Sequence, residues 1–154
     1  MRLIRLFTLL LIALGASLLA RAADFLEPAQ AFKLSAEAVG PDLVQVRFDI
    51  AEGYYLYRER FKFVAPEGVT LAEAELPQGK VKFDETFQKE VETYRGAMQI
   101  RVPVQAAKGP FMLEVTSQGC ADAGLCYPPE MQRLQVSLAA FGGDGSARLE
   151  QQAE

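Results

Sequence analysis

The feature that most constrains this chain is an alternation of apolar and polar residues with a period of two. From residue 44 to residue 50, every second side chain is apolar and those between are polar, which places the apolar set on one face of a strand. The pattern recurs at residues 32–36, 98–104, 111–115 and 134–138. Glycine and proline turn signals separate these segments. Several short strands with frequent turns predict an all-β chain, folded as a two-sheet, immunoglobulin-like β-sandwich.

The first 22 residues differ from the rest and predict a signal peptide. Arg2 and Arg5 precede a nearly continuous apolar run, and residues 20–22 read Ala-Arg-Ala, a small-x-small cleavage pattern. The run of about 15 residues is shorter than the roughly 20 that a membrane span needs. We therefore expect export from the cytoplasm, one folded domain over residues 23–140, and a polar tail or linker over residues 141–154. Within that tail, residues 146–154 are the one candidate for a helix.

The amino-acid composition excludes several kinds of partner and site. The net charge is −4, and loss of the signal arginines makes the exported chain more acidic, which argues against nucleic acid and anionic membranes as partners. Without histidine, the usual general base and the commonest metal ligand are missing. Two cysteines alone cannot complete a four-ligand zinc site, and we find no Gly-rich phosphate loop. We therefore expect no metal site.

The remaining chemistry lies in the two cysteines, Cys120 and Cys126. In an exported protein they are expected to form a disulfide. Closing so short a loop stabilises a fold by only about 2.4 kcal/mol in the loop-entropy model, and a domain of this size does not need it. Small residues and Gly124 between the cysteines leave the sulfurs accessible to an attacking thiolate. Two interpretations of the disulfide therefore remain: a structural bond and a redox-active pair.

Three segments resemble a known family. These are residues 118–129, which read Gln-Gly-Cys-Ala-Asp-Ala-Gly-Leu-Cys-Tyr-Pro-Pro, residues 53–58 and residues 94–96. Together they closely resemble the N-terminal periplasmic domains of bacterial thiol:disulfide interchange proteins of the DsbD type, over almost the whole exported chain. The resemblance implies an immunoglobulin-like sandwich whose cysteine pair shuttles electrons between proteins.

The resemblance also implies a mechanism. Cys126 would form mixed disulfides with partners and Cys120 would resolve them, as in a protein-disulfide reductase. No organic cofactor would be needed, because two thiolates carry both electrons. The implied partners are thioredoxin-fold proteins: a disulfide isomerase, a cytochrome c maturation thioredoxin, and an electron-donating thioredoxin-like domain fed by a separate membrane electron carrier. The full-length proteins of this family continue into membrane and thioredoxin-like parts. Whether this chain is free-standing or a fragment stays open.

The family also has a cap loop whose aromatic ring covers the disulfide. Here the matching ring is Phe87, with Phe83 as the competing candidate, and the acidic role falls to Asp84 or Glu85.

Tyr55 and Tyr57 share a parity, so in a strand both rings face one side, which the resemblance places beside the cysteines. Residues 58–62, rich in charge, are interpreted as a solvated strand end. The alternative function is a secreted immunoglobulin-like binding or adaptor module whose disulfide is structural.

Overall fold

The computed structural model describes residues 24–150, and this part of the chain is almost entirely β-structure. One short helix, α2 (Pro28–Ala31), and two 3-10 turns, η1 (Arg58–Arg60) and η2 (Ala139–Phe141), accompany the strands. The strands are β1 (Phe32–Gly40), β2 (Leu43–Ile50), β3 (Tyr54–Tyr57), β4 (Lys62–Val64), β5 (Thr70–Leu71), β6 (Lys80–Asp84), β7 (Lys89–Tyr94), β8 (Ala97–Ala106), β9 (Phe111–Ser117), β10 (Gly119–Ala121), β11 (Glu130–Ser137) and β12 (Ser146–Leu149).

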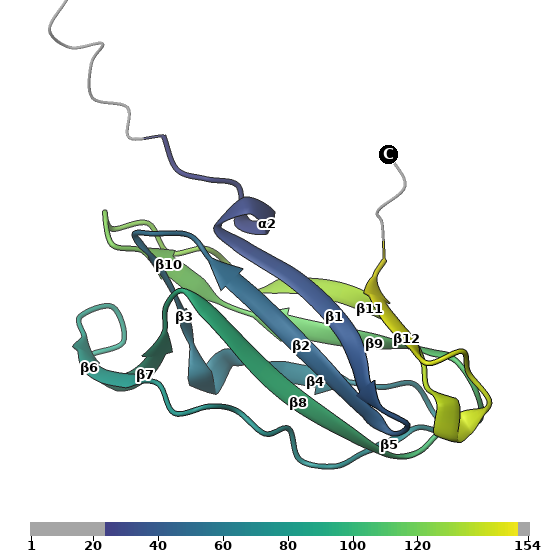
Figure 1. Ribbon diagram of the computed structural model, residues 1–154. Helices are drawn as coiled ribbons and strands as arrows, with labels where there is room; N and C mark the ends of the chain where they lie inside the picture. The colour runs from purple at the N-terminus through teal and green to yellow at the C-terminus, as the bar shows by residue number, and fades with distance from the viewer. Residues whose placement is uncertain (1–23, 151–154) are drawn as a thin grey trace, which may run out of the picture.

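Two four-stranded antiparallel sheets form the body of the molecule. Their strand orders are β1-β2-β8-β5 and β12-β11-β9-β4, and they lie face to face (Figure 1). The alternation read from the sequence is the reason, because each strand turns one apolar face inward. In β2 and β9 the buried residues are every second one. The structure therefore confirms the predicted all-β, immunoglobulin-like sandwich.

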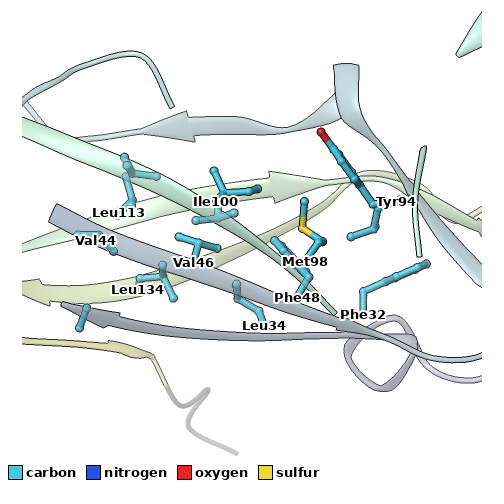
Figure 2. Packing of buried hydrophobic residues seen from close by; sticks show 14 of the residues in the cluster. Phe32, Leu34, Val44, Val46, Phe48, Tyr94, Met98, Ile100, Leu113 and Leu134 are labelled. Carbon is cyan, nitrogen blue, oxygen red and sulfur yellow. The ribbon is translucent and has the colours of Figure 1, made fainter. Parts of the chain in front are cut away.

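The core lies between these two sheets. Val46 of β2 is paired with Ile100 of β8, and both are fully buried. Figure 2 shows these side chains in one layer with Leu113 and Leu134, which come from the opposite sheet. Burying a side chain of this size contributes roughly 1.5–3 kcal/mol, so this layer supplies the main stabilisation of the fold.

A third small sheet, of order β10-β3-β7-β6, continues from the sandwich at one end. The β6–β7 hairpin and the loop that follows β10 project from this same end (Figure 1). The β10 strand pairs with β3 in the register Cys120↔Tyr55, and β3 pairs with β7 in the register Tyr57↔Thr93. The third sheet thus brings the cysteine segment and the hairpin to the two sides of one tyrosine-bearing strand.

The C-terminal boundary differs from the expectation. The sequence predicted a polar tail or linker from residue 141, with a helix as the one candidate element; instead, Ser146–Leu149 forms β12 and pairs antiparallel with β11. A tight turn makes the return possible, with Gly143 N–H bonded to Leu138 O and Gly145 N–H bonded to Ser137 O, both at 2.8 Å. The folded part therefore reaches Leu149, and the expected end near residue 140 is corrected.

The predicted signal peptide, residues 1–22, lies outside the described residues. Across residues 24–150, no helix has the length and apolar character needed to cross a membrane.

Candidate functional site

Cys120 and Cys126 are joined by a disulfide, as the sequence predicted. The two residues also face each other as an isolated antiparallel bridge, so the chain between them forms a short closed loop. Their surroundings differ: Cys120 is 1 % exposed within β10, whereas Cys126 is an exposed residue on the loop. An attacking thiolate therefore has access from the Cys126 side.

The strand β10 lies unusually close to β3. A Cβ atom added at Gly119 would overlap the carbonyl oxygen of Tyr55 and the ring of Phe32. Only glycine fits there, which explains why it directly precedes the first cysteine. The close approach holds Cys120 against the aromatic face of β3.

A small apolar cluster, separate from the main core, surrounds the buried cysteine. Its buried members are Tyr55, Tyr57, Val91 and Cys120, and Phe87 packs against them half-buried. The rings of Tyr55 and Tyr57 meet edge to face with centroids 5.5 Å apart, and those of Tyr57 and Phe87 do so at 5.3 Å. The two tyrosines thus share one side of β3, as their parity predicted.

Tyr57 links this cluster to a buried carboxylate. Its hydroxyl donates to Asp84 Oδ2 at 2.6 Å and lies 3.2 Å from Cys120 Sγ. Burial, followed by the hydrogen bond to Asp84, raises the pKa of Tyr57 far above its usual range. The phenol therefore keeps its proton at neutral pH; this one proton is donated to Asp84, and the phenol oxygen lies beside the sulfur.

Asp84 is 4 % exposed and carries the charge of this arrangement. Burial alone would raise the pKa of its carboxyl. The hydrogen bonds from Tyr57 and from the backbone N–H groups of Phe87 and Thr86 outweigh burial, so the pKa lies below its ordinary value. The bond from Phe87 N–H to Asp84 Oδ1 is 3.0 Å long. One carboxylate therefore holds both the phenol and the start of the hairpin loop.

The structure distinguishes between the open choices on that loop, which spans residues 85–88 between β6 and β7. Phe87 packs on the cysteine cluster, whereas Phe83 is 59 % exposed. Asp84 is bonded to Tyr57, whereas Glu85 is exposed. Phe87 and Asp84, rather than Phe83 and Glu85, are the residues that lie against the site.

One ion pair at the site was not foreseen. Arg95, at the turn between β7 and β8, donates two hydrogen bonds to Asp122 inside the disulfide loop, at 2.9 Å and 2.7 Å. Its guanidinium also lies over the Tyr55 ring at 5.0 Å, and Lys82 Nζ lies over the same ring at 3.5 Å. Both partners stand in segments that the sequence had singled out, but nothing in their spacing indicated that they would meet.

The charged segment 58–62 is only partly the solvated strand end that was expected. Arg58 begins η1 and donates to the Pro77 carbonyl at 2.7 Å, to Glu92 at 2.9 Å and to the Tyr94 hydroxyl at 2.9 Å. Arg60 is exposed, yet its guanidinium lies 4.7 Å from the centre of the Phe87 ring. The segment therefore supports the third sheet through Arg58, while its other charged side chains are exposed.

A second unforeseen contact ties down the start of the described chain. The backbone N–H of Leu26 donates to the Tyr54 hydroxyl at 2.8 Å, and the Tyr127 hydroxyl donates to the Leu26 carbonyl. Tyr54 is the β3 residue paired with Ala121, and Tyr127 directly follows Cys126. The segment before α2 thus braces the base of the cysteine loop.

Residues 24–150 contain no group of three or more histidine, cysteine, aspartate or glutamate side chains that could hold a metal ion. The geometry instead suits sulfur chemistry, because one sulfur is exposed and the other is held beside a phenol.

Comparisons with known proteins agree with this geometry. The family model described as "Thiol:disulfide interchange protein DsbD, N-terminal" matches residues 22–138. Among curated relatives, a thiol:disulfide interchange protein DsbD from Ralstonia nicotianae is 55% identical over 90% of this chain, covering 23% of its own length. DsbD 1 from Pseudomonas aeruginosa is 47% identical over 75% of this chain and 20% of its own. The chain thus spans about a quarter or less of the length of these relatives.

Solved structures give the same result at the level of the domain. The reduced N-terminal domain of Neisseria meningitidis DsbD has a TM-score of 0.72 and 33% identity, covering 85% of this chain and all of that one. The complex of the DsbD and PilB N-terminal domains from the same organism gives a TM-score of 0.66 at 33% identity, covering 84% of this chain and 97% of that one. The chain belongs to the family of DsbD N-terminal domains.

Proposed function

We propose that this chain is a thiol:disulfide interchange domain, a protein-disulfide reductase that passes electrons through Cys120 and Cys126 to thioredoxin-fold partners. The observation that carries the proposal is the asymmetry of the pair, with Cys126 exposed on a loop and Cys120 buried beside the Tyr57 hydroxyl. A structural staple gains nothing from such an arrangement. An exchange site needs it, because one sulfur must be accessible to form the mixed disulfide with a partner, and the other must stay close enough to resolve that disulfide.

The reaction begins from the reduced pair. The Cys126 thiolate attacks one sulfur of a partner disulfide, a bond forms between the two proteins, and the displaced partner sulfur leaves as a thiolate that takes up a proton. Cys120 then loses its proton and attacks Cys126, which forms the intramolecular disulfide and releases the second partner thiolate. Two electrons and two protons have passed to the partner, and no organic cofactor is needed.

Asp84 and Tyr57 serve the buried sulfur in this proposal. The Tyr57 hydroxyl, 3.2 Å from Cys120 Sγ, is held in place by the charged Asp84. In the second step, the single phenol proton turns from Asp84 toward the sulfur, and this hydrogen bond stabilises the Cys120 thiolate, where burial would otherwise disfavour the charge. Tyr55 closes the other side of the cluster as the cross-strand partner of Cys120.

The loop of residues 85–88 acts as the cap. Phe87 packs on the cluster of the cysteine and is only half-buried, so moving it costs little apolar contact. A partner that displaces this ring gains access to the disulfide from the hairpin side. When no partner is bound, the cap limits exchange between the disulfide and other thiols.

The proposed setting follows from the same chemistry. We infer export by the predicted signal peptide into the periplasm, where a thioredoxin-like domain fed by a membrane electron carrier re-reduces the pair. The relative from Neisseria meningitidis, whose N-terminal domain was solved in complex with the PilB N-terminal domain, supports protein partners for this domain. A disulfide isomerase and a cytochrome c maturation thioredoxin are the proposed acceptors.

Single-cysteine variants test the proposal. Mixed with an oxidised thioredoxin-fold domain, reduced Cys120→Ser should accumulate a disulfide-linked complex on a non-reducing gel, because Cys126 can attack but nothing resolves the product. Reduced Cys126→Ser should form no such complex, since its one remaining sulfur, that of Cys120, is buried. Equal trapping by both variants would contradict the assigned roles. No trapping by either variant would leave the alternative, a secreted immunoglobulin-like module with a structural disulfide.

A further inference from the structure

A single arginine joins the disulfide loop to the strand on which it rests. Arg95 makes a two-pronged contact with Asp122, with N–O distances of 2.9 Å and 2.7 Å, and Asp122 lies between the two cysteines in sequence. Two parallel N–H···O bonds fix direction as well as distance, which a lysine ammonium cannot do. The contact therefore restrains the orientation of the loop and not only its charge.

The same arginine also contacts strand β3. Its guanidinium lies 5.0 Å from the centre of the Tyr55 ring, and Nη1 is 3.4 Å from the Tyr54 carbonyl oxygen. Tyr55 is the cross-strand partner of Cys120. Arg95 thus contacts β3 beside the buried cysteine and, at the same time, the loop that leads to the exposed one.

Asp122 is held at its backbone as well. Its N–H donates to the Gly53 carbonyl at 2.8 Å, directly before β3. Neither this bond nor the contact with Arg95 involves a sulfur atom, so opening the disulfide breaks neither of them directly. Consistent with a charged pair, the hydrogen bond from Arg95 lowers the pKa of Asp122 below its ordinary value.

We propose that Arg95 is a positioning residue for thiol exchange, which through Asp122 keeps Cys126 opposite Cys120 after the disulfide has opened. The inference rests on the proposed function and adds a residue to it. In the mixed disulfide, Cys120 must attack Cys126 sulfur within one molecule, and the rate of such a step depends on how often the two sulfurs meet. Freeing the loop lowers that frequency without changing either sulfur.

The size of the effect is bounded by the exposure of the pair. The side chains of Arg95 and Asp122 are 46% and 49% exposed, so solvent screens their attraction. An exposed pair changes an equilibrium by at most about fivefold. The expected result is therefore a slowing of the resolving step by up to about fivefold, with a rise of up to about 20 mV in the reduction potential, because the reduced loop gains freedom.

Oxidised glutathione is the probe that separates the two steps. The reduced domain is mixed with it, samples are acid-quenched, and mass spectrometry follows the Cys126–glutathione adduct as it forms and then loses glutathione. Arg95→Gln and Asp122→Asn should leave adduct formation at the wild-type rate and slow glutathione release. The double variant should be no slower than either single variant, because both remove one interaction. Arg95→Lys should lie between.

The control is Arg47→Gln, which breaks an ion pair of similar exposure, 43% and 48%, on β2. It should release glutathione at the wild-type rate. Unchanged release in Asp122→Asn, or equal slowing of both steps, would overturn the positioning role. A lower melting temperature without slower release would show a merely structural pair. If the wild-type domain formed no adduct, the proposed function itself would fail, and the inference with it.

Discussion

Asp84 and Glu85 are neighbours in sequence, yet only one of them is part of the site. The register of the β6–β7 hairpin, which ends in the pair Asp84↔Lys89, turns Asp84 toward Tyr57 and leaves Glu85 exposed. The direction of a side chain at a hairpin end depends on this register, and two adjacent acidic residues carry no sign of it in their order. For the same reason, the choice between Phe83 and Phe87 needed the structure.

Asp84 should make the free energy of unfolding depend on pH in the acidic range. Its pKa is lowered in the folded state, below the ordinary 3.8, so the folded chain binds this proton less readily than the unfolded chain. The stabilisation is present above pH 4, and it is lost as the pH falls through the lower, folded-state pKa. Urea denaturation of Asp84→Asn should show a loss of about 1–2 kcal/mol at pH 7 and a weaker pH dependence below pH 4.

The matched control is Glu85→Gln, at the exposed neighbour. It should reproduce the acid limb of the wild-type curve. If Asp84→Asn and the wild type lost stability in parallel between pH 5 and pH 2, the Tyr57–Asp84 bond would not have the importance assigned to it.

At the scale of elements, the cap loop and the last strand are the parts that the sequence did not determine. Long alternating segments such as β2 and β9 were found because their pattern extends over many residues. The strand β12 has four residues, one of them buried, and follows a glycine-rich turn. So short a segment becomes a strand only because β11 offers it an edge, and that edge cannot be seen locally.

Removing the half-buried ring of the cap should open the site. Phe87→Ala takes away the contact with Tyr57, so exchange of the oxidised domain with a small thiol such as reduced dithiothreitol should become several-fold faster. Phe83→Ala, four residues earlier on the same hairpin and 59 % exposed, is the control and should react like the wild type. Stopped-flow fluorescence of the domain follows both. Equal rates in all three proteins would show that Phe87 covers nothing.

Deleting β12 tests the corrected boundary. A chain ending at Ala140 loses four cross-strand pairs with β11 and the buried Ala147. At roughly 0.2–1 kcal/mol per pair, the free energy of unfolding should fall by about 1–4 kcal/mol. A chain ending at Glu150 keeps β12 and should match the full-length protein in urea denaturation. Identical midpoints for both truncations would mean that β12 does not belong to the fold.

The molecule consists of a β-sandwich with its own core and a separate site that carries the cysteines. The main core lies between the two large sheets, whereas Cys120 sits in a separate cluster with Tyr55, Tyr57 and Val91 on the third sheet. Opening the disulfide therefore disturbs few core contacts. The sandwich was predictable because it follows from local alternation, and the cysteine pair because its motif is long. The contacts that join β3, the cap and the loop come from distant segments and appear only when the chain is folded.

The reduction potential of the Cys120–Cys126 pair distinguishes a redox-active disulfide from a structural one. The native domain is equilibrated in buffers of reduced and oxidised dithiothreitol or glutathione, and the reduced fraction is counted by thiol alkylation and mass spectrometry. We expect a potential above about −300 mV, in the range of disulfides that partner proteins open and remake. A potential well below −300 mV, with no reduction in the folded state, would identify an inert structural bond and contradict the proposed interchange function.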